Sequence, residues 1–199
     1  GGHGARPHQS VDAVWLAARV ITELQQTIAR RLDALQPVVI SFGKVEGGRA
    51  FNVIADQVRL LGTVRCLDLQ QHAQLPAWID ETVQGSCASG GGSAVVNYRC
   101  IAPPVHNDPQ LTTLLERCAV DCLGRDKVLP VEQPSLGAED FAELLRDVPG
   151  MMMRLGVAGP EGCAPLHNGA FALEEDALGV GVAVLTATVL AWITEHTSA

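Results

Sequence analysis

The sequence predicts a protein of mixed α and β structure, with an α+β domain over residues 1–102 followed by part of an α/β domain over residues 103–199. Three observations predict it. Apolar residues recur at the helical period, shorter runs alternate apolar and polar residues, and Pro103-Pro104 separates halves in which helices and strands follow different orders. With 47% hydrophobic and 18% charged residues, the chain has ample apolar material for folded cores.

The first half begins with its clearest helix, expected over residues 11–32, where Ser10 is a candidate N-cap. Two strands are expected at residues 38–42 and 58–65. The Gly47-Gly48 pair between them supplies a turn, so we expect these strands to pair as a hairpin.

A second helix is expected over about residues 69–83, where Pro76 must kink it or mark its true start. A glycine-rich loop then leads into residues 94–100, whose alternation predicts another strand. With one more strand expected just before Gly1, the order of elements is the split βαβ, or ferredoxin-like, arrangement.

The second half is expected to alternate helices and strands as part of an α/β sandwich. Residues 177–193 contain no charge, but 17 residues with two glycines and two threonines favour a helix buried against a sheet over a membrane span. We therefore expect no membrane partner. The other expected elements are helices at about 109–123 and from about Glu139, and strands near Val128 and at 150–157.

Charge and cysteine content restrict the partners and the compartment. The formal net charge is −8 and the basic residues are scattered singly, so nucleic acid is not an expected partner. The six cysteines form no Cys-x-x-Cys pair, and we expect reduced thiols in a cytoplasmic protein. Cys118 and Cys122, four apart on an expected helix, could together bind a metal, but core packing explains them better.

Four short motifs spread over nearly the whole chain carry the candidate site residues. They are GGHGARPH at residues 1–8, GRAFNVIAD at 48–56, GAEDFA at 137–142 and LHNGAF at 166–171. Any one motif is weak evidence, whereas the four together are specific. In this order and spacing they resemble the M20 metallopeptidase family, in particular its hippurate hydrolases, N-acyl-amino-acid amidohydrolases and amino-acid-conjugate hydrolases.

The resemblance implies a two-domain enzyme that hydrolyses the amide bond of an N-acyl or N-conjugated amino acid. An α/β catalytic domain would hold two divalent metal ions, of zinc, manganese, cobalt or nickel, and an inserted ferredoxin-like lid would also form a homodimer. A metal-bound water would be the nucleophile and a carboxylate would accept its proton. The boundary near residue 103 would be the return of the chain from lid to catalytic domain.

Two histidines acquire roles from the resemblance. His167 is the expected metal ligand, although a surface histidine beside a glycine turn is the alternative interpretation. The family usually has Ser-Pro after this histidine, where the present chain has Asn168-Gly169. His3 is the expected lid histidine, which donates to the developing oxyanion of the substrate. His8 is explained by its position before the first helix.

Three further residues are candidates for substrate binding. Asn52, expected in a strand of the lid, would contact the substrate, and Arg65 would pair with the free carboxylate of the amino acid. A solvated strand end explains Arg65 equally well. Glu139 would border the active site, although acidic residues are also common in a first helical turn, where they favour the helix dipole.

The family's upstream metal ligands and its Glu-Glu general base would lie before Gly1. Because the chain begins with Gly-Gly-His and not Met, we expect a C-terminal fragment that is inactive by itself. One alternative is a non-catalytic dimerisation module with the same lid fold. Another is a peptidase or deacylase from elsewhere in the superfamily.

Overall fold

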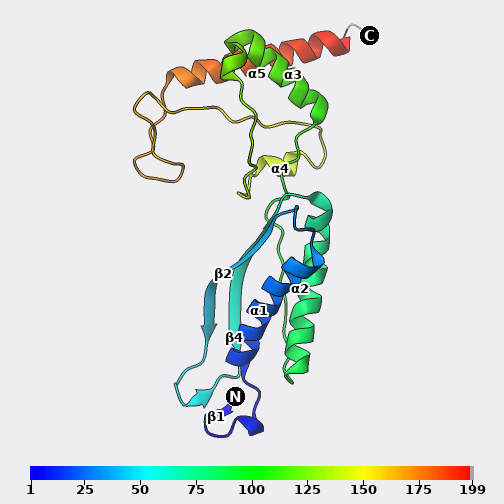
Figure 1. Cartoon of the computed structure of the whole chain (residues 1–199), viewed down its shortest axis with the longest axis vertical. Helices are drawn as coiled ribbons and strands as arrows, with labels where there is room; N and C mark the ends of the chain where they lie inside the picture. Colours follow the sequence, from blue (N-terminus) through cyan, green and yellow to red (C-terminus); the bar gives the residue numbers. More distant parts are fainter. Residues whose placement is uncertain (198–199) are drawn as a thin grey trace. The chain divides into compact units, whose positions relative to one another are not determined.

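In the computed structural model, which describes residues 1–197, the chain divides into two compact units (Figure 1). Unit 1 contains Gly1–Pro104 together with Pro134–Asp140. Unit 2 contains Val105–Gln133 together with the residues from Phe141 onward. Each unit has its own cluster of buried apolar side chains.

The main sheet of unit 1 is an antiparallel hairpin of β2 (Val38–Gly47) and β4 (Val58–Cys66). The pairing shifts once, between Phe42 and Lys44. The expected hairpin is therefore confirmed, and β2 continues five residues further than its apolar run, because backbone pairing with β4 extends it towards the glycine turn.

A second, smaller sheet pairs the start of the chain with the connection between the hairpin strands. It consists of β1 (Gly2–His3) and β3 (Val53–Ile54), which run antiparallel. Just after β1 lies a short 3₁₀ helix, η1 (Pro7–Gln9). This sheet brings two of the sequence motifs together.

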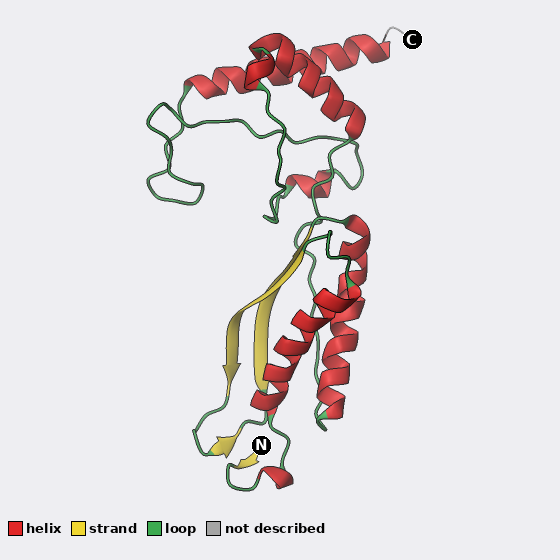
Figure 2. Cartoon of the chain, in the orientation of Figure 1, coloured by secondary structure: helices red, strands yellow, loops and turns green. Residues whose placement is uncertain are grey.

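Two long helices, α1 (Ala13–Arg31) and α2 (Leu69–Ser89), pack against the hairpin (Figure 2). Apolar residues at helical spacing on α1 and α2 meet the inward-facing side of the strands, which buries a shared core. The buried members of this core are Val20, Leu24, Ile40, Ile79, Val83 and Cys87.

The helix starts are set by aspartates. The Asp12 carboxylate accepts the N–H groups of Val14 (2.9 Å) and Trp15 (3.2 Å), so Asp12 is the N-cap of α1 and the expectation for Ser10 is wrong. Asp68 caps α2 in the same way. Since α2 begins at Leu69 and contains Pro76, the proline does not mark its start, and its interior position costs α2 one backbone hydrogen bond.

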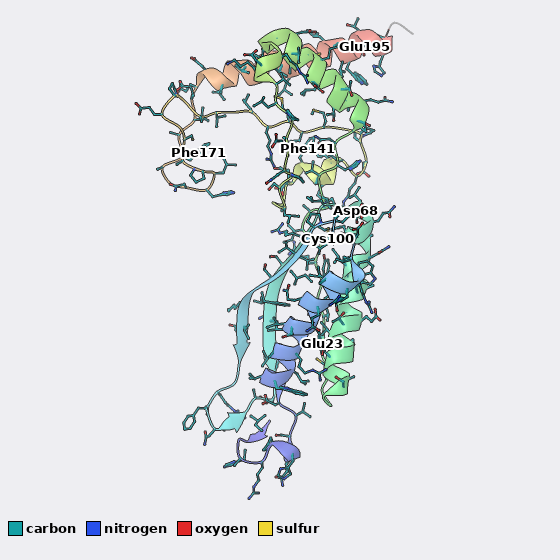
Figure 3. The ribbon with its side chains drawn as sticks, viewed as in Figure 1. Glu23, Asp68, Cys100, Phe141, Phe171 and Glu195 are labelled. Carbon is teal, nitrogen blue, oxygen red and sulfur yellow. The ribbon has the colours of Figure 1, made fainter. Side chains whose placement is uncertain are left out.

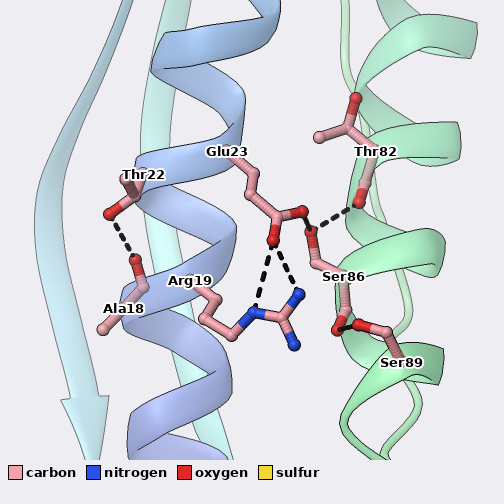
Figure 4. Close-up of polar contacts among 7 residues, drawn as sticks. All are labelled: Ala18, Arg19, Thr22, Glu23, Thr82, Ser86 and Ser89. Carbon is pink, nitrogen blue, oxygen red and sulfur yellow. Dashed lines mark hydrogen bonds and ion pairs between the residues drawn. The ribbon is translucent and has the colours of Figure 1, made fainter.

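A polar contact also joins α1 to α2 (Figure 4). Ser86, which is 1% exposed, donates its hydroxyl to the carboxylate of Glu23, and Arg19 donates to the same carboxylate at 2.8 Å. The Ser86 hydrogen bond, with the Arg19 guanidinium second, lowers the pKa of Glu23 from its ordinary value. The Arg19 guanidinium also lies 5.0 Å from the Trp15 ring centre, which holds it in place.

Residues 94–100 show the expected alternation but are not a strand. Ala94, Val96 and Tyr98 pack against the core, whereas Val95 is 87% exposed. No residue of this segment is paired in a ladder within the described chain. The period-2 pattern therefore indicates which side chains face the core, but it does not require a paired neighbour.

Unit 2 is built around α3 (Pro109–Leu123) and α5 (Asp176–Thr197), with a short α4 (Phe141–Leu144) and a 3₁₀ turn η2 (Arg125–Lys127). The boundaries of α3 agree with the prediction. Its buried residues Leu115 and Ala119 pack with Val184 of α5, and an Arg117–Glu195 ion pair joins the same helices.

The strands expected near Val128 and at 150–157 are absent from the described residues. The backbone of Met152 instead exchanges two hydrogen bonds with the Asn107 side chain, at 2.9 and 3.0 Å. The Asn107 amide therefore pairs with the backbone N–H and carbonyl groups that a neighbouring strand would otherwise bind. The helix expected from Glu139 begins at Phe141, which places Glu139 in the preceding loop.

The expected helix at 177–193 is confirmed by α5, but the expectation that it is buried against a sheet is wrong. Within the described residues it packs beside α3 and not on a sheet, and of its residues only Gly181 and Val184 are buried. By length and composition alone, α5 is the one described helix that could cross a membrane. One such helix is weak evidence for a span.

Candidate active site

The structure brings His3 and Asn52 together. His3 lies opposite Val53 in the small sheet, and the N–H of Gly4 donates to the Asn52 carbonyl oxygen at 2.9 Å. A Cβ on Gly4 would lie 2.9 Å from that same oxygen, which is closer than side-chain carbons normally approach. Glycine at position 4 therefore allows the two motifs to meet at this distance.

The hydrogen bonds of His3 determine which ring nitrogen carries a proton in the neutral form. Its Nδ1 accepts the N–H of Ala5 at 3.1 Å, so Nδ1 is unprotonated and the proton lies on Nε2. The ring is exposed. His3 can therefore present an N–H donor to a group outside the small sheet.

Asn52 occupies a turn and not a strand, which corrects the sequence expectation. The N–H of Val53 donates to the Ala50 carbonyl at 3.2 Å, and β3 begins only after Asn52. The side chain of Asn52 is exposed. Because β3 has only two residues, the local sequence does not show where the turn ends and the strand begins.

A cavity of about 320 Å³ lies beside this turn. Its walls come from the end of β2, the glycine turn, β3 and the start of β4. Gly48 has φ +73°, a conformation that glycine adopts without strain. The charged residues that line the cavity are Glu46, Arg49, Asp56 and Arg59. The sequence argument did not single these out; Arg49 and Asp56 were visible within the second motif.

Arg65 lies at the opposite end of the hairpin. It pairs with Val39, whereas the cavity is formed at the end where Gly47 pairs with Val58. Seven residue steps along β4 separate Val58 from Arg65, a distance of about 23 Å. Within unit 1 the structure therefore does not bring Arg65 to His3 and Asn52.

Glu139 is half-buried in the segment Pro134–Asp140, which belongs to unit 1. It precedes α4, whose first turn instead contains Glu143. The interpretation of Glu139 as an acidic residue in a first helical turn is therefore wrong, because the helix starts two residues later.

His167 lies in an exposed turn of unit 2. The N–H of Asn168 donates to the Pro165 carbonyl at 3.2 Å, and the Asn168 side chain accepts the N–H of Ala170 at 2.9 Å. The backbone φ of His167 is +67°, the only positive value for a non-glycine residue in the described chain. Such a conformation costs on the order of 1 kcal/mol and is more common at functional sites than elsewhere.

The described residues do not form a metal site by themselves. Over residues 1–197, no three or more histidine, cysteine, aspartate or glutamate side chains are grouped closely enough to hold an ion. His167 would supply only one ligand, and stable sites need three or more from the protein.

The described elements form a protein of mixed α and β structure, with polar candidate residues on its first unit. The profile of peptidase family M20/M25/M40 matches residues 7–191, and the chain belongs to this family.

Two relatives show the extent of the likeness. The chain is 49% identical over 187 residues to a Synechocystis sp. protein named probable hydrolase sll0100, covering 93% of this chain and 48% of that protein. It is 35% identical over 185 residues to an N-acetyldiaminopimelate deacetylase of Geobacillus sp., with the same coverage of 93% and 48%. The chain spans about half the length of these relatives.

A solved structure supports the α/β fold. A Bacillus subtilis protein described as a dinuclear metal-binding peptidase of the M20 family matches with a TM-score of 0.78 and 26% identity. The match covers 94% of this chain and 47% of that protein.

Proposed function

We propose that this chain is part of a metal-dependent amidohydrolase that cleaves the amide bond of N-acyl or N-conjugated amino acids in the cytoplasm. Residues 1–102 would form a ferredoxin-like lid and residues 103–199 the C-terminal part of the catalytic domain. Family membership over residues 7–191 supports a hydrolytic function, and the Geobacillus relative is named as a deacetylase of an N-acetylated compound.

The observation that carries the proposal is the pairing of His3 with the Asn52 turn. The Nε2–H of His3 would donate to the scissile carbonyl oxygen as negative charge develops on it, and Asn52 would contact the substrate beside it. A fixed donor of this kind stabilises the transition state more than the ground state. The Ala5 N–H at Nδ1 keeps the donor on the outward nitrogen.

The separation of His3 from Arg65 supports a homodimer in which they serve different sites. About 23 Å of β4 separates Arg65 from Val58, at the end of the hairpin that is connected to β3 and so to His3. One small substrate therefore cannot contact both His3 and Arg65 of one lid. We propose that His3 enters the active site of the partner subunit, while Arg65 binds the substrate carboxylate in the site of its own subunit. Glu139 would border that site.

For the metal, we propose that His167 contributes one ligand to a two-ion site of zinc, manganese, cobalt or nickel. The remaining ligands would lie in the part of the family fold that this chain does not span. The description of the Bacillus subtilis neighbour as dinuclear supports the number of ions. Bound divalent ions would supply Lewis-acid chemistry, and Arg65 of one subunit together with His3 of the other would orient the substrate towards them.

The test is an assay of the full-length protein with hippurate, N-acetyl and longer N-acyl amino acids, before and after chelation. We expect hydrolysis of at least one class, loss on chelation and recovery with divalent metal. His167→Ala should lower the metal content, whereas His106→Ala, which alters a histidine outside the four motifs, should not. Absence of all hydrolysis from a metal-loaded protein would favour the non-catalytic dimerisation module.

A further inference from the structure

Two cysteines and a histidine meet at the first turn of α2, outside the candidate active site. Cys66, the last residue of β4, donates its thiol to the Asp68 carbonyl oxygen, with the sulfur 3.7 Å away. The same oxygen accepts the N–H of His72 at 2.9 Å. The His72 Nε2 lies 3.4 Å from the sulfur of Cys100. Figure 3 shows Asp68 and Cys100 at the same end of unit 1.

The two thiols differ in exposure. Cys100 is exposed and Cys66 is half-buried. Burial raises the pKa of the Cys66 thiol, and the nearby charges of Asp68 and Cys100 raise it further. Burial also raises the pKa of Tyr98, and the charges of Cys66 and Cys100 raise it further.

The environment of Cys100 suits reaction with an electrophile. The thiolate is the reactive form of cysteine, and an imidazole nitrogen 3.4 Å away can accept the thiol proton. A resolving thiol near the exposed one is the usual arrangement where cysteine is oxidised reversibly. Residues 94–100 form no strand ladder within the described chain, so ladder hydrogen bonds do not oppose a movement of Cys100 towards Cys66.

We propose that Cys66 and Cys100 form a reversible oxidation site for hydroperoxides, with Cys100 oxidised first and Cys66 as the resolving thiol. In the first step the Cys100 sulfur attacks a peroxide oxygen, the O–O bond breaks, and Cys100 becomes a sulfenic acid as water or an alcohol leaves. In the second step the Cys66 sulfur attacks that of Cys100, the S–O bond breaks and water leaves. The two thiols give up two electrons, which reduce the peroxide.

The other four cysteines provide internal comparisons. Cys87 and Cys118 are buried in the cores of units 1 and 2. Cys163 is half-buried, and its sulfur lies 2.9 Å from the Ala172 carbonyl oxygen. Cys122 is exposed on α3 and serves as the matched control for Cys100.

The experiment treats the full chain with hydrogen peroxide, blocks remaining thiols and maps the cysteines by mass spectrometry. Trypsin cleaves after Arg65 and Arg99, which places Cys66 and Cys87 on one peptide and Cys100 on the next. Fragment spectra must therefore show whether Cys66 or Cys87 is linked to Cys100. We expect a Cys66–Cys100 disulfide that dithiothreitol reverses, with Cys122 still alkylated.

Variants separate the roles of the residues. Cys66→Ser should leave Cys100 as a sulfenic acid that dimedone labels, and His72→Gln should slow the oxidation of Cys100 on the order of tenfold. Cys122→Ser should change neither result. The proposal is overturned if Cys100 reacts no faster than Cys122, or if peroxide produces no Cys66–Cys100 linkage in the wild-type chain. Because that last measurement needs no variant, it decides the matter even if a substitution prevents folding.

Discussion

His3 is the residue whose replacement tests the proposed chemistry most directly. In the full-length protein, His3→Ala removes the proposed donor to the developing oxyanion, and turnover should fall about a hundred- to a thousand-fold. Metal content, measured by elemental analysis, should not change, because His3 is not an expected ligand. The control is His8→Ala, which alters an exposed histidine of η1. An equal loss of turnover in both variants would contradict the role of His3.

Ser86 is the second residue with a measurable effect. Ser86→Ala removes the hydroxyl that donates to Glu23 and should lower the free energy of unfolding by about 1 kcal/mol at neutral pH. The control, Ser89→Ala, alters an exposed serine one turn later and should have a smaller effect.

The effect of Ser86→Ala should depend on pH in a defined direction. Because the folded state lowers the pKa of Glu23 below 4.5, its stabilising contribution is present above that value and is lost as pH falls through the folded pKa. The difference between wild type and Ser86→Ala should therefore shrink below about pH 4.5. Urea unfolding at several pH values measures it, and a difference that grows in acid would refute this account.

At the scale of residues, the structure brings together some of the candidate site residues named from the sequence, whose roles stay predictions. The motifs containing His3 and Asn52 were recognised, and the structure places them in contact through Gly4. The charged side chains of the cavity were not singled out, because their position depends on the β2–β4 register. Glu139 and Arg65 were named from the resemblance, and it stays a prediction that both residues belong to one active site.

At the scale of elements, the small β1–β3 sheet depends on close backbone approach. Gly4→Ala places a methyl group 2.9 Å from the Asn52 carbonyl oxygen, so the chain must shift and the Gly4 hydrogen bond should weaken. Hydrogen exchange of the residue 4 amide should become faster by on the order of tenfold, which corresponds to about 1.4 kcal/mol of local opening.

Gly43→Ala is the matched control, since nothing lies within 4 Å of a Cβ placed there. The exchange rate at residue 4 should be the same as in wild type. If Gly4→Ala leaves the exchange rate unchanged as well, the small sheet does not depend on the glycine contact.

Helices were easier to predict than strands in this chain, for a physical reason. The boundaries of α3 follow from local signals, namely Asp108 as N-cap, Pro109 in the first turn and Gly124 after the last. A strand needs a partner that local sequence does not specify. Residues 94–98 and 153–157 both alternate between half-buried and exposed side chains, yet in the described chain neither segment joins a sheet.

At the scale of the whole molecule, we expect a two-fold dimer formed through residues 1–102. Light scattering at high concentration should give twice the chain mass of 21.0 kDa, and a strictly monomeric mass would contradict the prediction. Mixing full-length His3→Ala protein with His167→Ala protein should restore activity, because one site of each mixed dimer receives an intact histidine and an intact metal pair. If labelled subunits exchange and no activity returns, His3 does not act across the interface.

The division of the chain into units has a consequence for its synthesis. Segment 134–140 belongs to unit 1, although the chain has already contributed residues 105–133 to unit 2 by then. A ribosome adds residues in order, at about 5–20 per second, and the first residues to emerge usually fold first. The hairpin and α1–α2 can associate once α2 has emerged, but unit 1 is complete only after Asp140 has left the exit tunnel. Helix α3 must wait longer still, until α5 has emerged, and during that interval the apolar side chains that α3 buries against α5 are exposed on the nascent chain.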